Sequence, residues 1–266
     1  MRLRELSIIQ YQNVSKNPHL HRLWLSADAF NKQMDYLAMN NFLFLSMDDA
    51  IGFMGRREQI KNRRPISLTF DNGYLDFYEH AFPMLSHYQS PATVLISPPK
   101  VGKSVDMGPR KAHYLTWSHL GELAKNNITI GAYEDASWNI NHVPEDTVQR
   151  HIIEYKKILE DKLGIEIRYF GVKEGVPNPK VRDLLVSEGY RAFLTECPTN
   201  RRPDLYSLGR IQVDDDDFNI FLTKMSRTYL FFKDKKSWKY IRQYSLDKMA
   251  HKASELFDRI RGADAH

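Results

Sequence analysis

The chain has 266 residues, a net charge of +5 and a single cysteine, Cys197, so an intrachain disulfide is excluded. Hydrophobic residues make up 42% and charged residues 27%, as in ordinary globular domains, and no stretch approaches the roughly 20 consecutive apolar residues of a membrane span. No nucleic-acid recognition motif accompanies the positive charge, so we expect no nucleic-acid binding. The first residues enter a strand-like pattern without a signal-peptide pattern, which predicts a cytoplasmic location.

Short apolar runs alternate with amphipathic segments, a pattern typical of repeated βα units around a parallel sheet or barrel. In the first half of the chain, strands are expected at residues 8–11, 42–45, 66–70 and 92–97. Helices are expected after a cap at Ser26, over 74–88 with a break near Pro83, and over 116–124. One domain is therefore predicted over residues 1–232.

The second half continues the alternation. Strands are expected at 128–131, 190–195 and 206–213, and helices at 144–163, before Gly164, and at 181–188, before Gly189. Four acidic residues at 214–217 read as a solvated loop. The basic tail, residues 233–266, has apolar residues near helical spacing, so a separate C-terminal helix is predicted, packed on the domain or presented to a protein partner.

Residues 66–74 form an apolar run that ends in Asp71 at a glycine turn, Asn72-Gly73-Tyr74. This run resembles the first signature of the polysaccharide deacetylases, which have the NodB homology fold and read Thr-Phe-Asp-Asp-Gly-Tyr at this point. The resemblance extends over about residues 7–213. It implies an α/β fold, a distorted (β/α)7-type barrel similar to a TIM barrel, with a C-terminal helix, a carbohydrate or acetylated-sugar ligand, and a divalent metal such as zinc.

The resemblance also exposes departures at the metal site. In the family the first Asp is the base and the second binds the metal, but Asn72 stands at the second position. After Gly131 the family has Ser-His-Thr-x-x-His, whereas Tyr133 and Ser137 stand where the two histidines would be. Neutral amide, phenol and hydroxyl groups are poor ligands for zinc, nickel or cobalt. We therefore expect no metal cofactor.

Other signatures of the family are also incomplete. The third corresponds loosely to residues 168–175 and lacks the expected proline, and the late Leu-x-His is missing from residues 208–213. Asp71 is then a vestigial base, because a metal is what lowers the pKa of bound water from about 15.7 toward 7. Its carboxylate has a structural alternative, accepting hydrogen bonds from the Gly73 turn. A rebuilt site formed by Glu134, Asp135 and His142 beside Asp71 is a further alternative.

The leading functional hypothesis is a pseudoenzyme that keeps the barrel and a glycan-binding groove, or acts as a partner, in bacterial cell-envelope or extracellular polysaccharide metabolism. Its candidate ligand-binding residues are Asn72, Tyr74, Tyr133, Ser137, Trp138, Arg168 and Tyr169. The alternative is an active hydrolase of a carbon-nitrogen (non-peptide) or ester bond, with a rebuilt or metal-independent site around Asp71. A third hypothesis treats the C-terminal helix as a docking surface and the barrel as a scaffold.

Overall fold

The computed structural model describes residues 6–16, 24–55, 63–108, 111–196, 204–213 and 217–226. The chain divides into two compact units, Met1–Asp214 and Asp215–His266. The described part of the second unit is helix α7 (Phe218–Met225), whose first turn is capped by the Asp217 side chain. Cys197, residues 214–216 and the predicted extension at 233–266 lie outside the described residues.

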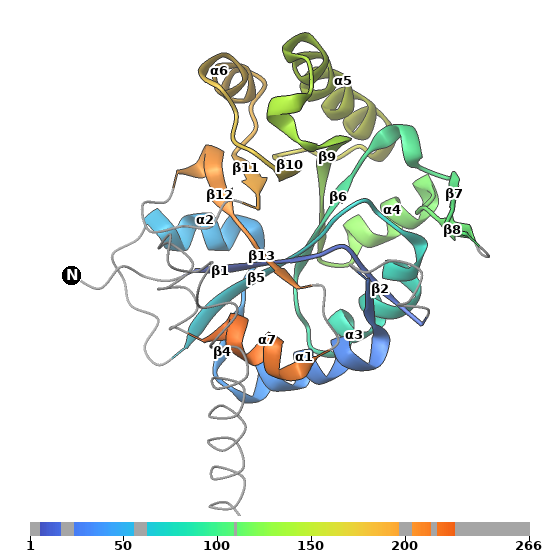
Figure 1. Ribbon diagram of the computed structural model, residues 1–266, viewed down its shortest axis with the longest axis vertical. Helices are drawn as coiled ribbons and strands as arrows, with labels where there is room; N and C mark the ends of the chain where they lie inside the picture. The colour runs from blue at the N-terminus through green and yellow to red at the C-terminus, as the bar shows by residue number, and fades with distance from the viewer. Residues whose placement is uncertain are drawn as a thin grey trace, which may run out of the picture. The chain divides into compact units, whose positions relative to one another are not determined.

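The first unit is built around a parallel sheet that is nearly closed into a barrel (Figure 1), which confirms the predicted fold class. Along the sheet the order is β12-β11-β10-β9-β6-β5-β1-β13, and β4 pairs with β5 at one side. The strands are β1 (Ser7–Tyr11), β4 (Phe42–Phe44), β5 (Arg64–Phe70), β6 (Ala92–Ile96), β9 (Ile128–Asn139), β10 (Tyr169–Glu174), β11 (Ala192–Thr195), β12 (Leu208–Gly209) and β13 (Ile211–Val213). Two short pairs lie outside it, parallel β2 (Asn13–Ser15) with β3 (Trp24–Ser26) and antiparallel β7 (Ser104–Asp106) with β8 (Lys111–His113).

The helices expected after Ser26, over 116–124 and over 144–163 are present, and the one expected at 181–188 begins earlier, at Pro179. The helix at Met47–Gly55 is not predicted by the sequence. They are α1 (Ala27–Met39), α2 (Met47–Gly55), η2 (Phe77–Ala81), α3 (Phe82–His87), η3 (Pro98–Lys100), α4 (Trp117–Lys125), η4 (Ile140–His142), α5 (Glu145–Leu163), α6 (Pro179–Ser187) and η5 (Leu205–Ser207). The Ser26 hydroxyl caps α1, and Gly164, at φ +66°, ends α5. No helix in the described part of the chain is long and apolar enough to cross a membrane.

The break expected near Pro83 is a π-helical turn. The Phe82 N–H donates to the Phe77 carbonyl five residues earlier, which makes η2 a wider turn than an α-helix. Pro83 follows directly, at the start of α3, where its missing N–H leaves no helical hydrogen bond unmade.

The chain connects the two edges of the sheet at one residue. β12 pairs with β11, and β13 pairs with β1 on the other side of the opening, so the chain crosses from one edge of the sheet to the other at Arg210. The Arg210 N–H donates to the Thr195 carbonyl at 2.8 Å, which holds the crossing to β11. The predicted final strand over 206–213 is therefore two short strands on either side of Arg210.

The second difference is the length of β9. The sequence predicts a strand at 128–131 followed by a loop, but β9 continues to Asn139. Residues 132–134 keep their pairing with β10, and a register irregularity follows between Val172 and Glu174 of β10. The polar residues after Gly131 suggested a loop, yet their backbone groups are satisfied by a neighbouring strand.

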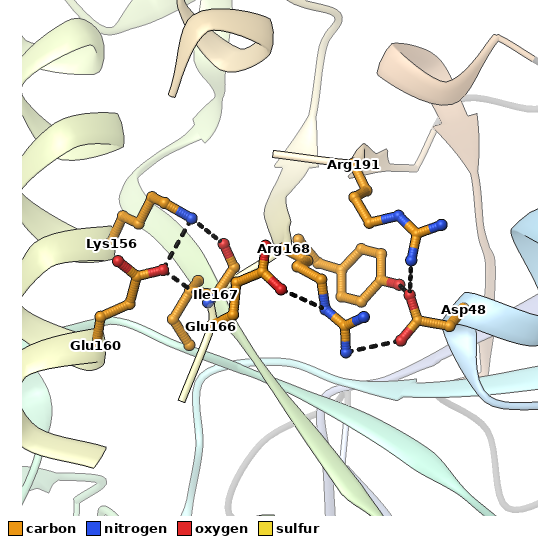
Figure 2. Close-up of polar contacts among 8 residues, drawn as sticks. Asp48, Lys156, Glu160, Glu166, Ile167, Arg168 and Arg191 are labelled. Atoms are coloured by element: carbon orange, nitrogen blue, oxygen red, sulfur yellow. Dashed lines mark hydrogen bonds and ion pairs between the residues drawn. The ribbon is translucent and has the colours of Figure 1, made fainter. Parts of the chain in front are cut away.

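The start of β10 is tied to two helices (Figure 2). Asp48 of α2 accepts hydrogen bonds from the Tyr169 hydroxyl at 2.5 Å and from Arg191 at 2.5 Å, and it pairs with Arg168 at 2.8 Å. On the other side, Lys156 of α5 donates to the Ile167 carbonyl at 2.5 Å. These contacts fix the entry of β10 into the sheet.

Two glycines allow the barrel interior to close around Leu95. A Cβ on Gly171 would lie 2.3 Å from Leu95 Cδ1, and one on Gly131 would lie 2.7 Å from Leu95 Cδ2. The Gly131 Cβ would also meet the Tyr169 carbonyl oxygen at 2.9 Å. Backbone atoms cannot move aside as a flexible side chain can, so Gly131 is required by the close approach of β9 and β10.

We expect Gly131→Ala to lower the free energy of unfolding by about 1–3 kcal/mol, because the added methyl group overpacks this contact. Gly121→Ala in α4 is the matched control, since its Cβ would meet nothing within 4 Å. In that helix interior alanine should stabilise by about 0.5–1 kcal/mol. Urea denaturation measures both changes, and equal effects at the two positions would contradict this account of the core.

Candidate functional site

Asp71 follows the carboxyl end of β5, and its side chain is held in a buried ion pair. Both terminal nitrogens of the Arg210 guanidinium donate to it, Nη1 to Oδ1 at 2.6 Å and Nη2 to Oδ2 at 3.2 Å. Gln10 Nε2 donates to the same Oδ2 at 2.6 Å. The Asp71 and Arg210 side chains have 0% exposed surface. Three donors from β1 and the barrel closure therefore engage both carboxylate oxygens.

Arg210 reaches further acceptors across the barrel interior. Its Nη2 donates to the Val172 carbonyl of β10 at 2.8 Å, and its Nη1 lies 3.4 Å from the Thr69 hydroxyl of β5. The guanidinium group thus links β5, β10 and the closing strands around one buried positive charge.

The turn after Asp71 is defined by two left-handed residues. Asn72 has φ +69° and Gly73 has φ +68°, and the Gly73 N–H donates to the Asp71 backbone carbonyl at 2.9 Å. The expectation that the Asp71 carboxylate accepts from this turn is wrong, because that carboxylate binds Arg210 and Gln10 instead. Asn72 is partly exposed, and Asn tolerates the left-handed region better than most residues.

Tyr133 lies at the same end of the barrel, in β9, and is 2% exposed. Burial raises the pKa of its phenol well above the ordinary value, and the nearby Asp71 carboxylate raises it further, partly through a side-chain hydrogen bond. The hydroxyl is therefore protonated at neutral pH. A protonated phenol is a hydrogen-bond donor to Asp71 and a poor metal ligand.

A rim of aromatic and charged groups adjoins these residues, in which Tyr74, Lys100 and Asp135 are partly exposed and Trp24 and Tyr114 are buried. Tyr74 stacks on Tyr114 with ring centroids 4.9 Å apart, and Trp24 meets Tyr74 edge-on at 5.1 Å. The Lys100 ammonium group lies 5.4 Å from the Tyr114 ring centroid and pairs with Asp135. Burial and Tyr114 both raise the pKa of Tyr74, so its hydroxyl is neutral and able to donate.

The rebuilt site considered from the sequence does not assemble. Glu134 is 1% exposed and pairs with His151 of α5, whose ring stacks on Tyr155. Asp135 binds Lys100 and accepts from the Ser97 hydroxyl at 2.9 Å. His142 is exposed in η4. The cluster of potential metal ligands that is present among the described residues contains none of these three side chains.

The remaining predicted ligand-binding residues are placed elsewhere. Arg168 and Tyr169 stand at the amino end of β10, whereas Asp71 follows the carboxyl end of parallel β5, so the barrel separates them. Tyr169 is 0% exposed and bound to Asp48, which leaves its ring inaccessible to a ligand in this structure. The side chains of Ser137 and Trp138 lie outside the described part of the structure.

Sequence reasoning missed Arg210 and Gln10. Residues 208–213 stand out in the sequence by their missing histidine, and Gln10 falls within an apolar strand pattern. A signal was present in both places, because a polar or charged residue in the middle of a buried strand needs a buried partner. Asp71, also in line with a buried strand, was the available acid.

Comparison with known proteins identifies the family of the chain. A family model described as polysaccharide deacetylase matches residues 58–193, a little over half of the chain. The chain belongs to the polysaccharide deacetylase family. It is 24% identical over 211 residues to YxkH of Bacillus subtilis (strain 168), a polysaccharide deacetylase homologue, with 79% of this chain and 71% of YxkH covered.

Solved deacetylases share the fold. IcaB from Ammonifex degensii superposes with a TM-score of 0.69 at 22% identity, over 79% of this chain and 92% of IcaB. The deacetylase PplD of Streptococcus pyogenes, solved in complex with acetate, gives 0.67 at 20% identity, over 83% of this chain and 98% of PplD. At these identities the likeness establishes a common barrel.

We expect Arg210→Met to lower the free energy of unfolding by about 3–5 kcal/mol, because it leaves the Asp71 carboxylate buried without its counter-charge. Arg182→Met is the matched control. Arg182 pairs with Asp204 on the surface, where the side chains are 43% and 39% exposed, so its loss should cost below about 1 kcal/mol.

Adding Asp71→Leu to Arg210→Met should recover about 2 kcal/mol, because the isolated charge is removed with its partner. Urea denaturation of the four members of this cycle gives the coupling. Strictly additive losses would contradict a direct ion pair between these two residues.

Proposed function

We propose that this member of the polysaccharide deacetylase family binds an acetylated carbohydrate without metal-dependent hydrolysis, in bacterial cell-envelope or extracellular polysaccharide metabolism. The observation that carries the proposal is the buried Asp71–Arg210 pair, with Gln10 as a third partner. A general base needs a free lone pair directed at the attacking water. Here the carboxylate oxygens accept from the protein's own donors.

The residues at the family's metal positions do not fit a divalent ion. Asn72 offers a neutral amide, and the Tyr133 phenol is held protonated by burial and by Asp71. Ligands of zinc, cobalt or nickel in such sites are imidazole nitrogens and carboxylates. The charge that a metal would bring is supplied by the Arg210 guanidinium, which lies against Asp71 and is fully buried.

The partly exposed rim supports a carbohydrate ligand. Tyr74 presents a partly exposed ring that stacks on the buried Tyr114, and Lys100 and Asp135 lie beside this pair with polar groups. Aromatic rings with a few oriented hydrogen-bonding groups are the usual lining of small-molecule sites. An N-acetylated sugar suits such a surface, because its ring has apolar C–H faces and its edge carries hydroxyl and amide groups.

The proposal is tested with an N-acetylglucosamine pentamer as the probe. We expect no acetate release above buffer when zinc, cobalt or nickel is added, but measurable binding by calorimetry. Tyr74→Ala should weaken binding about tenfold, or about 1.4 kcal/mol, through the lost ring contact. Tyr78→Ala is the control, since Tyr78 stacks on His119 and bonds to Glu122 in α4.

Acetate release that disappears in a folded Asp71→Asn variant would contradict the proposal and establish the alternative, a working hydrolase centred on Asp71. Equal loss of binding in Tyr74→Ala and Tyr78→Ala would contradict the assignment of the rim. Circular dichroism of each variant distinguishes these outcomes from unfolding.

A further inference from the structure

Three metal-binding side chains gather where the chain leaves the Asp71 turn. The ligand atoms of Asp76, Glu79 and His80 all lie within 4.8 Å of one another. Within the described ranges, these three residues are the group of potential metal ligands that lies this close together. None of them belongs to the family's metal signature. Asp76 and His80 are partly exposed and Glu79 is exposed, so an ion in solution has access.

The local backbone explains why these side chains converge. Asp76 is the N-cap of η2, and Glu79 and His80 follow at positions i+3 and i+4, which share one face of a helix. Phe77 and Ala81 point the other way and are buried. π-helical turns of this kind occur often at functional sites.

A buried side chain from another element supplies a second, independent observation. Asn13 of β2 is 1% exposed, and its Nδ2 donates to Asp76 Oδ2 over 3.3 Å, so its amide group faces the cluster. The Asn13 Oδ1 atom accepts no hydrogen bond within the described part of the chain. Buried amide oxygens are normally satisfied, and an unsatisfied one needs an explanation such as an ion.

The orientation of that amide suggests how an ion would be held. Amide oxygen and nitrogen are assigned from their hydrogen-bond partners. Turning the Asn13 amide by half a revolution would direct Oδ1 at the Asp76 carboxylate. Two oxygen acceptors repel one another at that separation unless a cation lies between them.

We propose that Asp76, Glu79, His80 and Asn13 form a binding site for a divalent transition-metal ion of the zinc type. Two carboxylate oxygens and one imidazole nitrogen are the ligand types suited to such an ion, and the Asn13 amide oxygen adds a weaker fourth contact. Ligands about 2.1 Å from a tetrahedral ion lie about 3.4 Å apart, so the cluster must contract. The Glu79 side chain, 51% exposed, is free to make that adjustment.

The ion has a structural role at this position. It joins β2, through Asn13, to the helix that begins directly after the Asp71–Tyr74 turn, and so it stabilises the segment that presents Tyr74. The site does not depend on the proposed carbohydrate function, because no group of the Asp71–Arg210 pair takes part in it.

The test is a titration of the full chain, free of any affinity tag, with zinc by equilibrium dialysis and with cobalt by visible absorption. We expect one ion per chain, a rise in Tm, and a cobalt spectrum with nitrogen and oxygen ligation. Glu79→Gln and His80→Asn each remove a ligand on the helix and should lower the affinity by about 100-fold. Asn13→Ser should also lower the affinity.

Two controls keep the outcome decisive. His87→Asn in α3 removes a histidine that lies against Tyr88, outside the cluster, and should leave affinity unchanged. Glu79 is half-exposed, so its variant reports on binding without risk of unfolding. No binding at millimolar zinc, binding indifferent to Glu79→Gln and His80→Asn, or binding abolished by Asn72→Gly would overturn the proposal, the last placing the ion at the family's signature.

Discussion

The Arg210 guanidinium lies at the point where the barrel closes, and its charge organises the carboxyl end of the sheet. It joins Asp71 of the β5 turn to the Val172 carbonyl of β10, while its own backbone passes from β11 to β1. Burying both ions carries a large desolvation penalty that their attraction and extra hydrogen bonds must offset. Gln10 and Tyr133 provide such hydrogen bonds at Asp71. The pair therefore specifies how the barrel closes, and it uses the carboxylate that a hydrolase would need.

The first signature survives for reasons of backbone geometry. Asn72 and Gly73 both have positive φ, and a Cβ on Gly73 would lie 2.4 Å from the Ile96 side chain. A turn of this shape requires Gly at one position and favours Asn or Asp at the other, whatever chemistry follows. Retention of this turn in the sequence thus follows from the fold. The contacts open to Asp71 depend on the side chains around this turn, at Tyr133 and Arg210.

Periodicity and caps were enough to predict α1, α4, α5, α6 and most strands of the sheet, but not α2, α7 or β10. Ser26, Gly164 and Gly189 stand where helix termini require them, and alternating apolar runs identified the parallel sheet. The extension of β9 could not be read from Glu134 and Asp135, because their strand conformation depends on pairing with β10 and on partners from α5 and η3. Local polarity is overridden by tertiary contacts at such positions.

The placement of some candidate residues follows from the sequence, but the main contact of Asp71 does not. Asp71, Asn72 and Tyr74 follow the carboxyl end of β5, and Tyr133 approaches Asp71 from β9, while their role in binding a ligand stays a prediction. The partner of Asp71 comes from 139 residues further along the chain, a separation at which sequence spacing carries no geometric information. Tyr169 illustrates the converse, because its place in the third signature suggested the site, whereas it begins β10 and lies at the opposite end of the barrel.

The most direct test of this account is cobalt binding at the family's metal position, measured by visible absorption in a Glu79→Gln background. The chain is compared with its Asn72→Asp, Tyr133→His, Ser137→His variant. We predict a tightly bound, nitrogen-ligated cobalt ion in the triple variant and none in the parent chain. A stoichiometric cobalt spectrum in the parent that is lost on Asp71→Asn would show that the Asp71 carboxylate is available to a metal, and would contradict the central role given to its pair with Arg210.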